Sequence, residues 1–226
     1  MTKIEATPPG YTLSLHNNTV LQAEAVIVAA PAFVTSDLVA GLDPDLAETL
    51  AAIPYVSTAT VSMAYPLDLI PRPLDGYGYL VPRAEGQAIQ ACTWSSTKFP
   101  HRAPEGFGLL RVFLGRAGQE QVLEASDAEL LTLVGRELRQ VLGITARPRL
   151  QRIFRWPQAM PQYTLGHLDR LATIEKRLAL HSGLFVAGNA YHGIGLPDCI
   201  ASGEKAAAAV AAFTQTISES IRQCAQ

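Results

Sequence analysis

The sequence has few cysteines and no long hydrophobic run. No segment reaches the roughly 18 consecutive apolar residues of a membrane-spanning helix, and no apolar signal-peptide core follows the first residues. The three cysteines, Cys92, Cys199 and Cys224, are odd in number, widely spaced and without a CxxC pair. This pattern argues against a disulfide framework and gives no support to a zinc or other metal site.

An excess of charge of one sign is also missing. The 18 basic and 20 acidic residues give a formal net charge of −2 and are scattered over both halves of the chain. Such a balance provides neither an extended basic surface nor an acidic tail. We therefore expect no binding to nucleic acid. We also expect a reducing, cytoplasmic location, with at most a peripheral association with membranes.

What the sequence does contain is enough apolar material for a folded core. Hydrophobic residues make up 48% of its 226 residues. This length and composition allow one sizeable domain or two small ones. There is neither an internal repeat nor a low-complexity linker, so a compact folded chain is expected.

Strand signals dominate the first half of the chain. Alternating or continuous apolar residues predict strands over 11–15 and 26–30, with a turn at His16–Asn18 between them. Further β-rich runs are separated by glycine and proline clusters and predict an antiparallel sheet; they cover 56–65, 77–81, 89–94 and 109–114. Residues 147–163 are interpreted as one strand followed by an irregular loop, because of the Trp156–Pro157 pair and Pro161.

Helix signals are clearest where a capping residue precedes a periodic apolar pattern. Ser126 and Glu129 form a capping box, and the spacing that follows predicts a helix ending at Gly143. A short helix is predicted from Asp43 and Pro44, closed by Pro54. Further helices are expected over about 167–180 and, rich in alanine, over about 198–221.

A glycine-rich turn lies between a predicted strand at 184–187 and the last helix. Its sequence, HGIGLPD (192–198), is similar to the dinucleotide fingerprint GxGxxG, but Asp198 replaces the third glycine and only one helix follows. It therefore cannot be the primary dinucleotide site. Free amides at a helix start can still receive an electron-rich group such as the edge of a flavin. The alternative is that Gly193 and Gly195 merely allow a tight turn.

Four segments together resemble the protoporphyrinogen oxidase family, within the superfamily of the monoamine oxidases and phytoene desaturases. They are AEAVIVAAPA (23–32), FPHRAPEG (99–106), MPQYTLGH (160–167) and GLFVAGNAYHGIGLPDCIASGEKAA (183–207). Their order and spacing fit along essentially the whole chain. Family members are roughly twice as long, however, and begin with a GxGxxG unit that holds the FAD pyrophosphate.

The resemblance implies an α+β fold that matches the C-terminal half of the family. An antiparallel substrate-domain sheet with helices is expected over 36–165. Residues 1–35 and 166–226 would form the C-terminal part of an FAD/NAD(P)-binding-like domain, whose N-terminal Rossmann unit is missing here.

The resemblance also assigns binding residues. Ile194, Gly195 and Leu196 correspond to backbone contacts with the flavin, and Trp156 to an aromatic residue near the isoalloxazine ring, although core packing is an alternative role for Trp156. The positions that line the tetrapyrrole pocket are Leu80, Thr93 and Phe113. Thr93 departs from the apolar residue that is usual there.

Other polar residues receive no catalytic role. Arg83, Arg102 and Arg111 are nearest in sequence to the pocket strands, but the resemblance places the carboxylate-binding arginine outside this sequence. We interpret these three arginines as surface residues. His167 is expected to make a structural contact, His192 has no assigned role, and Cys199 is expected to pack.

The resulting hypothesis is the C-terminal half of an FAD-dependent porphyrinogen oxidase of haem biosynthesis. It would oxidise protoporphyrinogen IX or coproporphyrinogen III by hydride transfer to FAD. Alone it should be inactive and hold FAD weakly or not at all. The expected partners are a tetrapyrrole, the missing N-terminal half and a second copy of the chain. Two alternatives remain: a non-catalytic module that self-associates and at most binds a porphyrin, and an amine or carotenoid oxidoreductase of the same superfamily.

Overall fold

The computed structural model describes residues 1–224, although the side chains of residue 218 and of residues 220–224, Cys224 among them, lie outside the description. The chain forms two compact units. The first combines Met1–Tyr55 with the segment from Pro161 onward, and the second is Val56–Met160. Each unit has its own hydrophobic core.

The first unit contains two small sheets. Three strands form an antiparallel meander, β1 (Lys3–Thr7), β2 (Gly10–Ser14) and β3 (Val20–Ala23). The second sheet pairs β4 (Val26–Val28) with β10 (Leu184–Val186) in parallel. This pairing joins two segments that are far apart in the sequence, which is why both chain ends belong to one unit.

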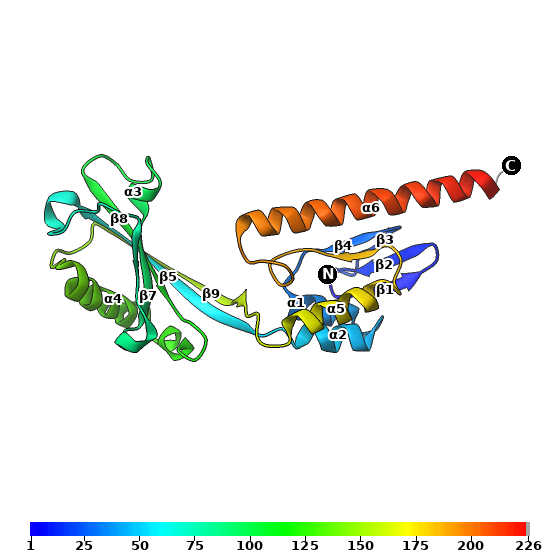
Figure 1. Cartoon of the computed structure of the whole chain (residues 1–226), viewed down its shortest axis with the longest axis horizontal. Coiled ribbons are helices and arrows are strands. Elements are labelled where there is room, and N and C mark those ends of the chain that lie inside the picture. Colours follow the sequence, from blue (N-terminus) through cyan, green and yellow to red (C-terminus); the bar gives the residue numbers. More distant parts are fainter. Residues whose placement is uncertain (225–226) are drawn as a thin grey trace. The chain divides into compact units, whose positions relative to one another are not determined.

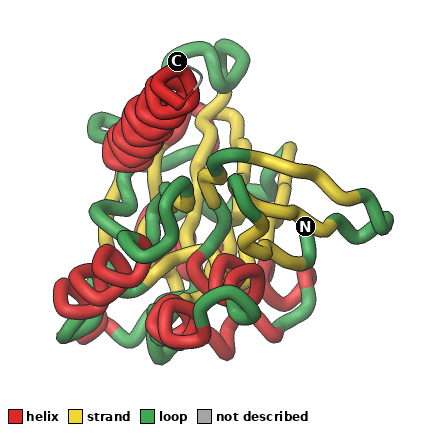
Figure 2. The backbone as a smooth tube through the Cα atoms, turned by 90° about the vertical axis from the view of Figure 1, so that its right-hand side faces the viewer, coloured by secondary structure: helices red, strands yellow, loops and turns green. Residues whose placement is uncertain are grey.

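Four helices complete the first unit (Figure 1). They are α1 (Ala32–Val39), α2 (Pro44–Ala51), α5 (His167–Leu178) and α6 (Leu196–Cys224). The apolar faces of α2 and α5 supply Leu46, Leu50, Leu171 and Ile174 to the core around β4 and β10. The last helix runs unbroken to the end of the described chain (Figure 2). It contacts β4 and β10, and Ala206 is buried there, whereas Ala207, Ala208, Ala211 and Ala212 are exposed.

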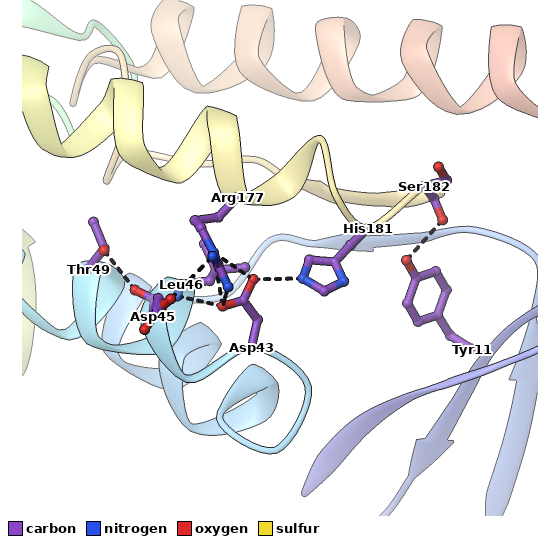
Figure 3. Close-up of polar contacts among 8 residues, drawn as sticks. All are labelled: Tyr11, Asp43, Asp45, Leu46, Thr49, Arg177, His181 and Ser182. Atoms are coloured by element: carbon purple, nitrogen blue, oxygen red, sulfur yellow. Dashed lines mark hydrogen bonds and ion pairs between the residues drawn. The ribbon is translucent and has the colours of Figure 1, made fainter.

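A buried carboxylate links two of these helices (Figure 3). Asp43 is the N-cap of α2 and accepts a hydrogen bond of 3.0 Å from the Leu46 amide. Arg177, in the last turn of α5, donates to both carboxylate oxygens at 3.0 and 2.6 Å, and His181 Nε2 lies 2.7 Å from Oδ2. The Asp43 side chain therefore fixes the start of α2 against the end of α5.

The second unit is built on a five-stranded sheet. Its strand order is β6-β7-β8-β5-β9, with bounds Gly78–Leu80, Ile89–Trp94, Phe107–Leu114, Tyr55–Pro66 and Leu150–Pro161. The pairs β6–β7, β7–β8 and β8–β5 are antiparallel, as predicted. Short helices connect the strands: α3 (Ser95–Lys98) and the 3₁₀ turns Leu67–Leu69, Arg83–Glu85 and Glu120–Glu124.

Helix α4 (Asp127–Leu142) covers one face of this sheet (Figure 1). The predicted capping box is confirmed at Ser126 and Glu129, and the helix ends at Gly143 in the left-handed conformation. Its apolar stripe packs on alternate residues of β5 and β8, in a cluster that includes Leu130, Val134, Leu138, Val61, Met63, Leu110 and Val112. Local capping and tertiary packing thus agree along this helix.

Two local predictions were wrong, and one helix was missed. The turn at His16–Asn18 leads from β2 into β3 and not into residues 26–30, whose strand β4 pairs in parallel with β10. The predicted loop after 156 is instead part of the strand β9, which continues through Trp156 and Pro157 to Pro161. β9 is an edge strand of the sheet, and proline is tolerated there because one side of the strand needs no N–H donor. Helix α1 was not predicted, since Pro31 precedes it without a capping side chain.

The units also divide at different positions from the expected domain limits of 35 and 165. Helices α1 and α2 belong to the first unit because Leu38, Leu46 and Leu50 lie in its core. The assignment of cofactor and substrate roles to the two parts stays a prediction.

Candidate functional site

The glycine turn of the first unit is held by its neighbours' side chains. The Tyr163 hydroxyl donates to the Asn189 carbonyl at 2.7 Å and accepts from the Gly193 amide at 2.8 Å. Burial is the main cause of a raised pKa at Tyr163, so the hydroxyl stays protonated and can make both bonds. Ser202, on α6, accepts from the Gly188 amide at 3.0 Å. The turn is therefore a fixed structure.

The segment around Tyr163 supplies a second support. The rings of Tyr163 and His167 stack with centroids 4.1 Å apart, and His167 Nε2 lies 3.1 Å from the Tyr191 carbonyl oxygen. His167 thus makes the predicted structural contact. Sequence reasoning gave no role to Tyr163, and only the quoted segment MPQYTLGH pointed towards it.

Asp198 explains the missing third glycine. Its carboxylate accepts from the Gly195 amide at 3.1 Å, an acidic N3 residue reaching back to the N-cap. Gly193 has φ +153°, and a Cβ placed on it would lie 2.4 Å from Asp198 Cγ. The turn folds closely over this side chain, which requires glycine at position 193.

Three backbone amides were predicted to contact a flavin, and the structure distinguishes among them. The Gly195 amide is already bonded to Asp198. Within the described part of the chain, the amides of Ile194 and Leu196 have no acceptor. Both side chains are exposed, at 51% and 81%. The start of α6 therefore offers two N–H donors without an acceptor among the described residues, at the positive end of a helix.

The predicted tetrapyrrole residues lie in the second unit, on one face of its sheet. In the cross-strand register, Leu80 is opposite Ala91, Ala91 is opposite Phe113, and Phe113 is opposite Thr60. The adjoining row is Gly78, Thr93, Arg111 and Ser62. These residues alternate with the buried residues that face α4, so both rows lie on the opposite face. We call it the distal face.

Trp156 belongs to the distal face as well. On β9, Ile153 packs against the core cluster, and Arg155 forms an ion pair with Asp127 of α4. Alternation then places Phe154 and Trp156 on the other side. Their rings lie 6.4 Å apart and are about half exposed, as is expected for an uncovered aromatic surface. Trp156 therefore lies in the second unit with the predicted substrate residues, whereas Ile194, Gly195 and Leu196 lie in the first.

An apolar groove of about 530 Å³ lies within the first unit. It runs between α5 and α6 beside β10 and is lined mainly by aliphatic side chains, among them Leu171, Ile174, Leu178, Leu184, Val186 and Ala206. The sequence gave no signal for this groove, because its lining comes from α5, β10, the glycine turn and α6, which are separate in the sequence.

No catalytic acid or base was predicted, and the buried thiol is not a nucleophile. Burial raises the pKa of Cys92 to about 12, so it stays a neutral thiol at physiological pH. Among the described side chains, no group of three His, Cys, Asp or Glu residues gathers as metal ligands. In the same part of the chain, no helix is long and apolar enough to span a membrane.

The strand, glycine turn and long helix of the first unit, together with the antiparallel sheet of the second, define a two-part α+β chain typical of flavin-dependent oxidoreductases. Comparison with known proteins makes this specific. The chain belongs to the flavin containing amine oxidoreductase family, whose model matches residues 1–211.

Within this family, the chain is similar to porphyrinogen oxidases. The chain is 34% identical over 207 residues to the coproporphyrinogen III oxidase of Bacillus subtilis (strain 168), covering 91% of this chain and 44% of the relative. It is 32% identical over 203 residues to the chloroplastic protoporphyrinogen oxidase of Oryza sativa subsp. japonica, covering 85% and 38%.

A solved structure agrees with the fold. A protein of Exiguobacterium sp. 255-15, described as a candidate protoporphyrinogen oxidase, superimposes with a TM-score of 0.76 at 33% identity. The match covers 96% of this chain and 46% of that one. The chain thus spans less than half the length of the relatives it matches.

Proposed function

We propose that this chain is the C-terminal part of a flavin-dependent porphyrinogen oxidase of haem biosynthesis. Its substrate would be coproporphyrinogen III or protoporphyrinogen IX, since its relatives are named coproporphyrinogen III oxidase and protoporphyrinogen oxidase. The observation that carries the proposal is that strand register places Leu80, Thr93 and Phe113 on the distal face of one sheet. Alternation along β9 places Trp156 on the same face. A half-exposed face with aromatic rings suits a flat, apolar tetrapyrrole.

The glycine turn fits the flavin end of such an enzyme. The unpaired amides of Ile194 and Leu196 suit the carbonyl-rich edge of an isoalloxazine ring, and the N-terminal end of α6 favours electron-rich groups. FAD, when bound, supplies the hydride acceptor for porphyrinogen oxidation. The role proposed for the chain's own residues is binding and orientation, with Tyr163 and Asp198 holding the turn.

A further polypeptide segment is expected to hold the FAD phosphates. The parallel pair β4–β10 is only two strands wide, whereas parallel sheets are normally larger and covered on both faces. The apolar groove beside β10 supports the same expectation. We therefore expect the isolated chain to bind FAD at less than full stoichiometry and to oxidise porphyrinogens slowly or not at all.

Porphyrin titration tests the proposal directly. Coproporphyrin III or protoporphyrin IX should quench the tryptophan fluorescence of the purified chain saturably, since Trp156 lies on the distal face. Leu80→Asp should weaken this binding, because it places a charge on an 83% exposed apolar position of that face. Leu180→Asp, at a 68% exposed position of the first unit, is the matched control and should bind as the unmodified chain does.

The proposal would fail if neither porphyrin bound saturably, or if both aspartate variants weakened binding equally. An FAD titration of the same preparations reports on the glycine turn. Full-stoichiometry FAD binding by the isolated chain would contradict the expected need for a further segment.

A further inference from the structure

The strands of the second unit have an unusual charge composition. None of β5, β6, β7, β8 and β9 contains an aspartate or glutamate, and their charged residues are all arginines: Arg111, Arg152 and Arg155. The sheet therefore presents positive charge with no negative charge from its own strands to balance it.

These three arginines do not share one environment. Arg155 points towards α4, where it forms an ion pair with Asp127 and donates to the Ala125 carbonyl at 2.6 Å. Arg111 lies in the distal-face row beside Thr93. By alternation with Ile153, Arg152 also lies on the distal face. The two distal-face arginines are thus the ones without an acidic partner.

Arg111 in particular lacks any polar partner. Other arginines of the unit have acceptors within the chain: Arg83 donates to the Ala117 carbonyl at 3.0 Å, and the terminal nitrogens of Arg116 lie within 3.5 Å of three carbonyl oxygens. Within the described residues the Arg111 guanidinium has neither an ion pair nor a hydrogen bond. Arg152 donates only to the carbonyl of its neighbour Gln151.

The surroundings of Arg111 are apolar or uncharged. Its register neighbours are Thr93 and Ser62, and the adjoining row contains Leu80, Ala91 and Phe113. A guanidinium presents a planar fork of donors that matches a carboxylate and binds it through paired hydrogen bonds. A ligand that complements this surface is flat and apolar in its body and carries carboxylates at its edge.

Resting on the proposed function, we propose that Arg111 is a specificity residue that binds a propionate carboxylate of the tetrapyrrole, with Arg152 available for a second one. Arg111 is exposed, as expected for a surface residue, and the proposal adds a carboxylate-binding role at that surface. The tetrapyrrole ring would lie across Leu80 and Phe113, and the arginine would fix its orientation in the plane of the sheet.

The test compares a porphyrin acid with its ester. Coproporphyrin III and its tetramethyl ester have the same ring but differ in carboxylate charge, and both can be titrated in neutral detergent at low salt. Arg111→Gln should weaken binding of the acid by roughly ten- to a hundredfold and leave binding of the ester unchanged. Arg111→Lys should retain part of the lost affinity, since it keeps the charge but not the fork.

Arg136→Gln is the matched control. Arg136 is an exposed arginine on α4, the helix that covers the opposite face, and its loss removes the same charge. Affinity of this variant for the acid should equal that of the unmodified chain. Raising the salt concentration should reduce the difference between acid and ester.

Three outcomes would overturn the assignment. Unchanged binding of the acid by Arg111→Gln would do so. An equal loss of affinity for the acid and the ester would also overturn it, because such a loss would reflect a structural change and not the carboxylate contact. Urea unfolding of Arg111→Gln would show whether the substitution destabilises the fold. If the unmodified chain bound neither porphyrin, the proposed function itself would fail, and the assignment with it.

Discussion

Within the first unit, single buried side chains link separate elements, and Asp43 links the start of α2 to the end of α5. Burial alone would raise its pKa, but the hydrogen bonds from Arg177, the Leu46 amide and His181, with the charge of Arg177, lower the pKa well below its ordinary value. Asp43 is only 1% exposed, and its carboxylate remains ionised in the folded state. Tyr163 and His167 have a comparable role at the glycine turn.

Asp43→Asn should destabilise the first unit by about 2–4 kcal/mol. The substitution leaves the Arg177 guanidinium without its buried counterion and changes the acceptor at the start of α2. The free energy of unfolding from urea titration, followed by far-UV circular dichroism, measures the effect. Asp45→Asn is the control, because Asp45 is an exposed partner of the same arginine, 3.2 Å away, and should cost at most about 1 kcal/mol.

Lowering the pH should remove the stabilisation that the ionised Asp43 carboxylate contributes. A carboxyl group whose pKa is lowered on folding stabilises the protein fully above its unfolded pKa of about 3.9, and this contribution is lost as the pH falls through that value towards the folded pKa. The stability difference between the unmodified chain and Asp43→Asn should therefore narrow from pH 7 to pH 3.5. A difference that stays constant over this range would contradict the role given to the carboxylate.

At the scale of elements, some helices and strands could be predicted from local signals, whereas others depended on tertiary context. Helix α4 could be predicted from Ser126, Glu129 and Gly143, since its caps and apolar stripe agree with its packing. Strand β9 could not be predicted in full, because Pro157 is compatible with a strand only at the edge of a sheet. Whether a strand lies at an edge is a property of the sheet and not of the strand.

Gly193→Ala tests the geometry of the turn before α6. An added Cβ would meet the Asp198 carboxyl group at 2.4 Å in a backbone conformation that favours glycine, so we expect a loss of about 1–3 kcal/mol. Gly203→Ala on the same helix meets nothing within 4 Å and should stabilise the helix by about 0.5–1 kcal/mol. Thermal unfolding followed by circular dichroism should shift in opposite directions for the two variants. An unchanged or raised unfolding midpoint for Gly193→Ala would show that the turn tolerates a side chain at position 193.

At the scale of the whole molecule, the two units have separate cores and differ in their tryptophan content. Both tryptophans, Trp94 and Trp156, lie in the second unit, so tryptophan fluorescence reports on that unit alone. Circular dichroism reports on both units. A multi-domain chain need not unfold in a single step, and this difference in probes can separate the steps.

Truncating one core leucine in each unit should shift the unfolding transition that a different probe reports. Leu110→Ala, in the second unit, should shift the tryptophan transition, and Leu46→Ala, in the first, should shift circular dichroism while leaving the tryptophan transition in place. Both leucines are fully buried, and each truncation should cost about 2–5 kcal/mol. If Leu46→Ala moved the tryptophan transition equally, the units would unfold as one cooperative body.

The sequence by itself determined the elements with strong local signals and the sites carried by a contiguous motif. The resemblance of one contiguous segment to the family implied Ile194, Gly195 and Leu196 as flavin contacts, and that assignment stays a prediction. The absence of acidic residues from all five strands of the second unit is also a property of the sequence.

Only the tertiary structure decided which separated residues share a surface. Leu80, Thr93, Arg111 and Phe113 come from three strands, and strand pairing and register place them on the distal face. The contacts of Asp43 with Arg177 and His181 depend on the packing of α2 against α5. Local sequence cannot encode such neighbours, because register and helix packing are set by burial of the whole unit's apolar surface.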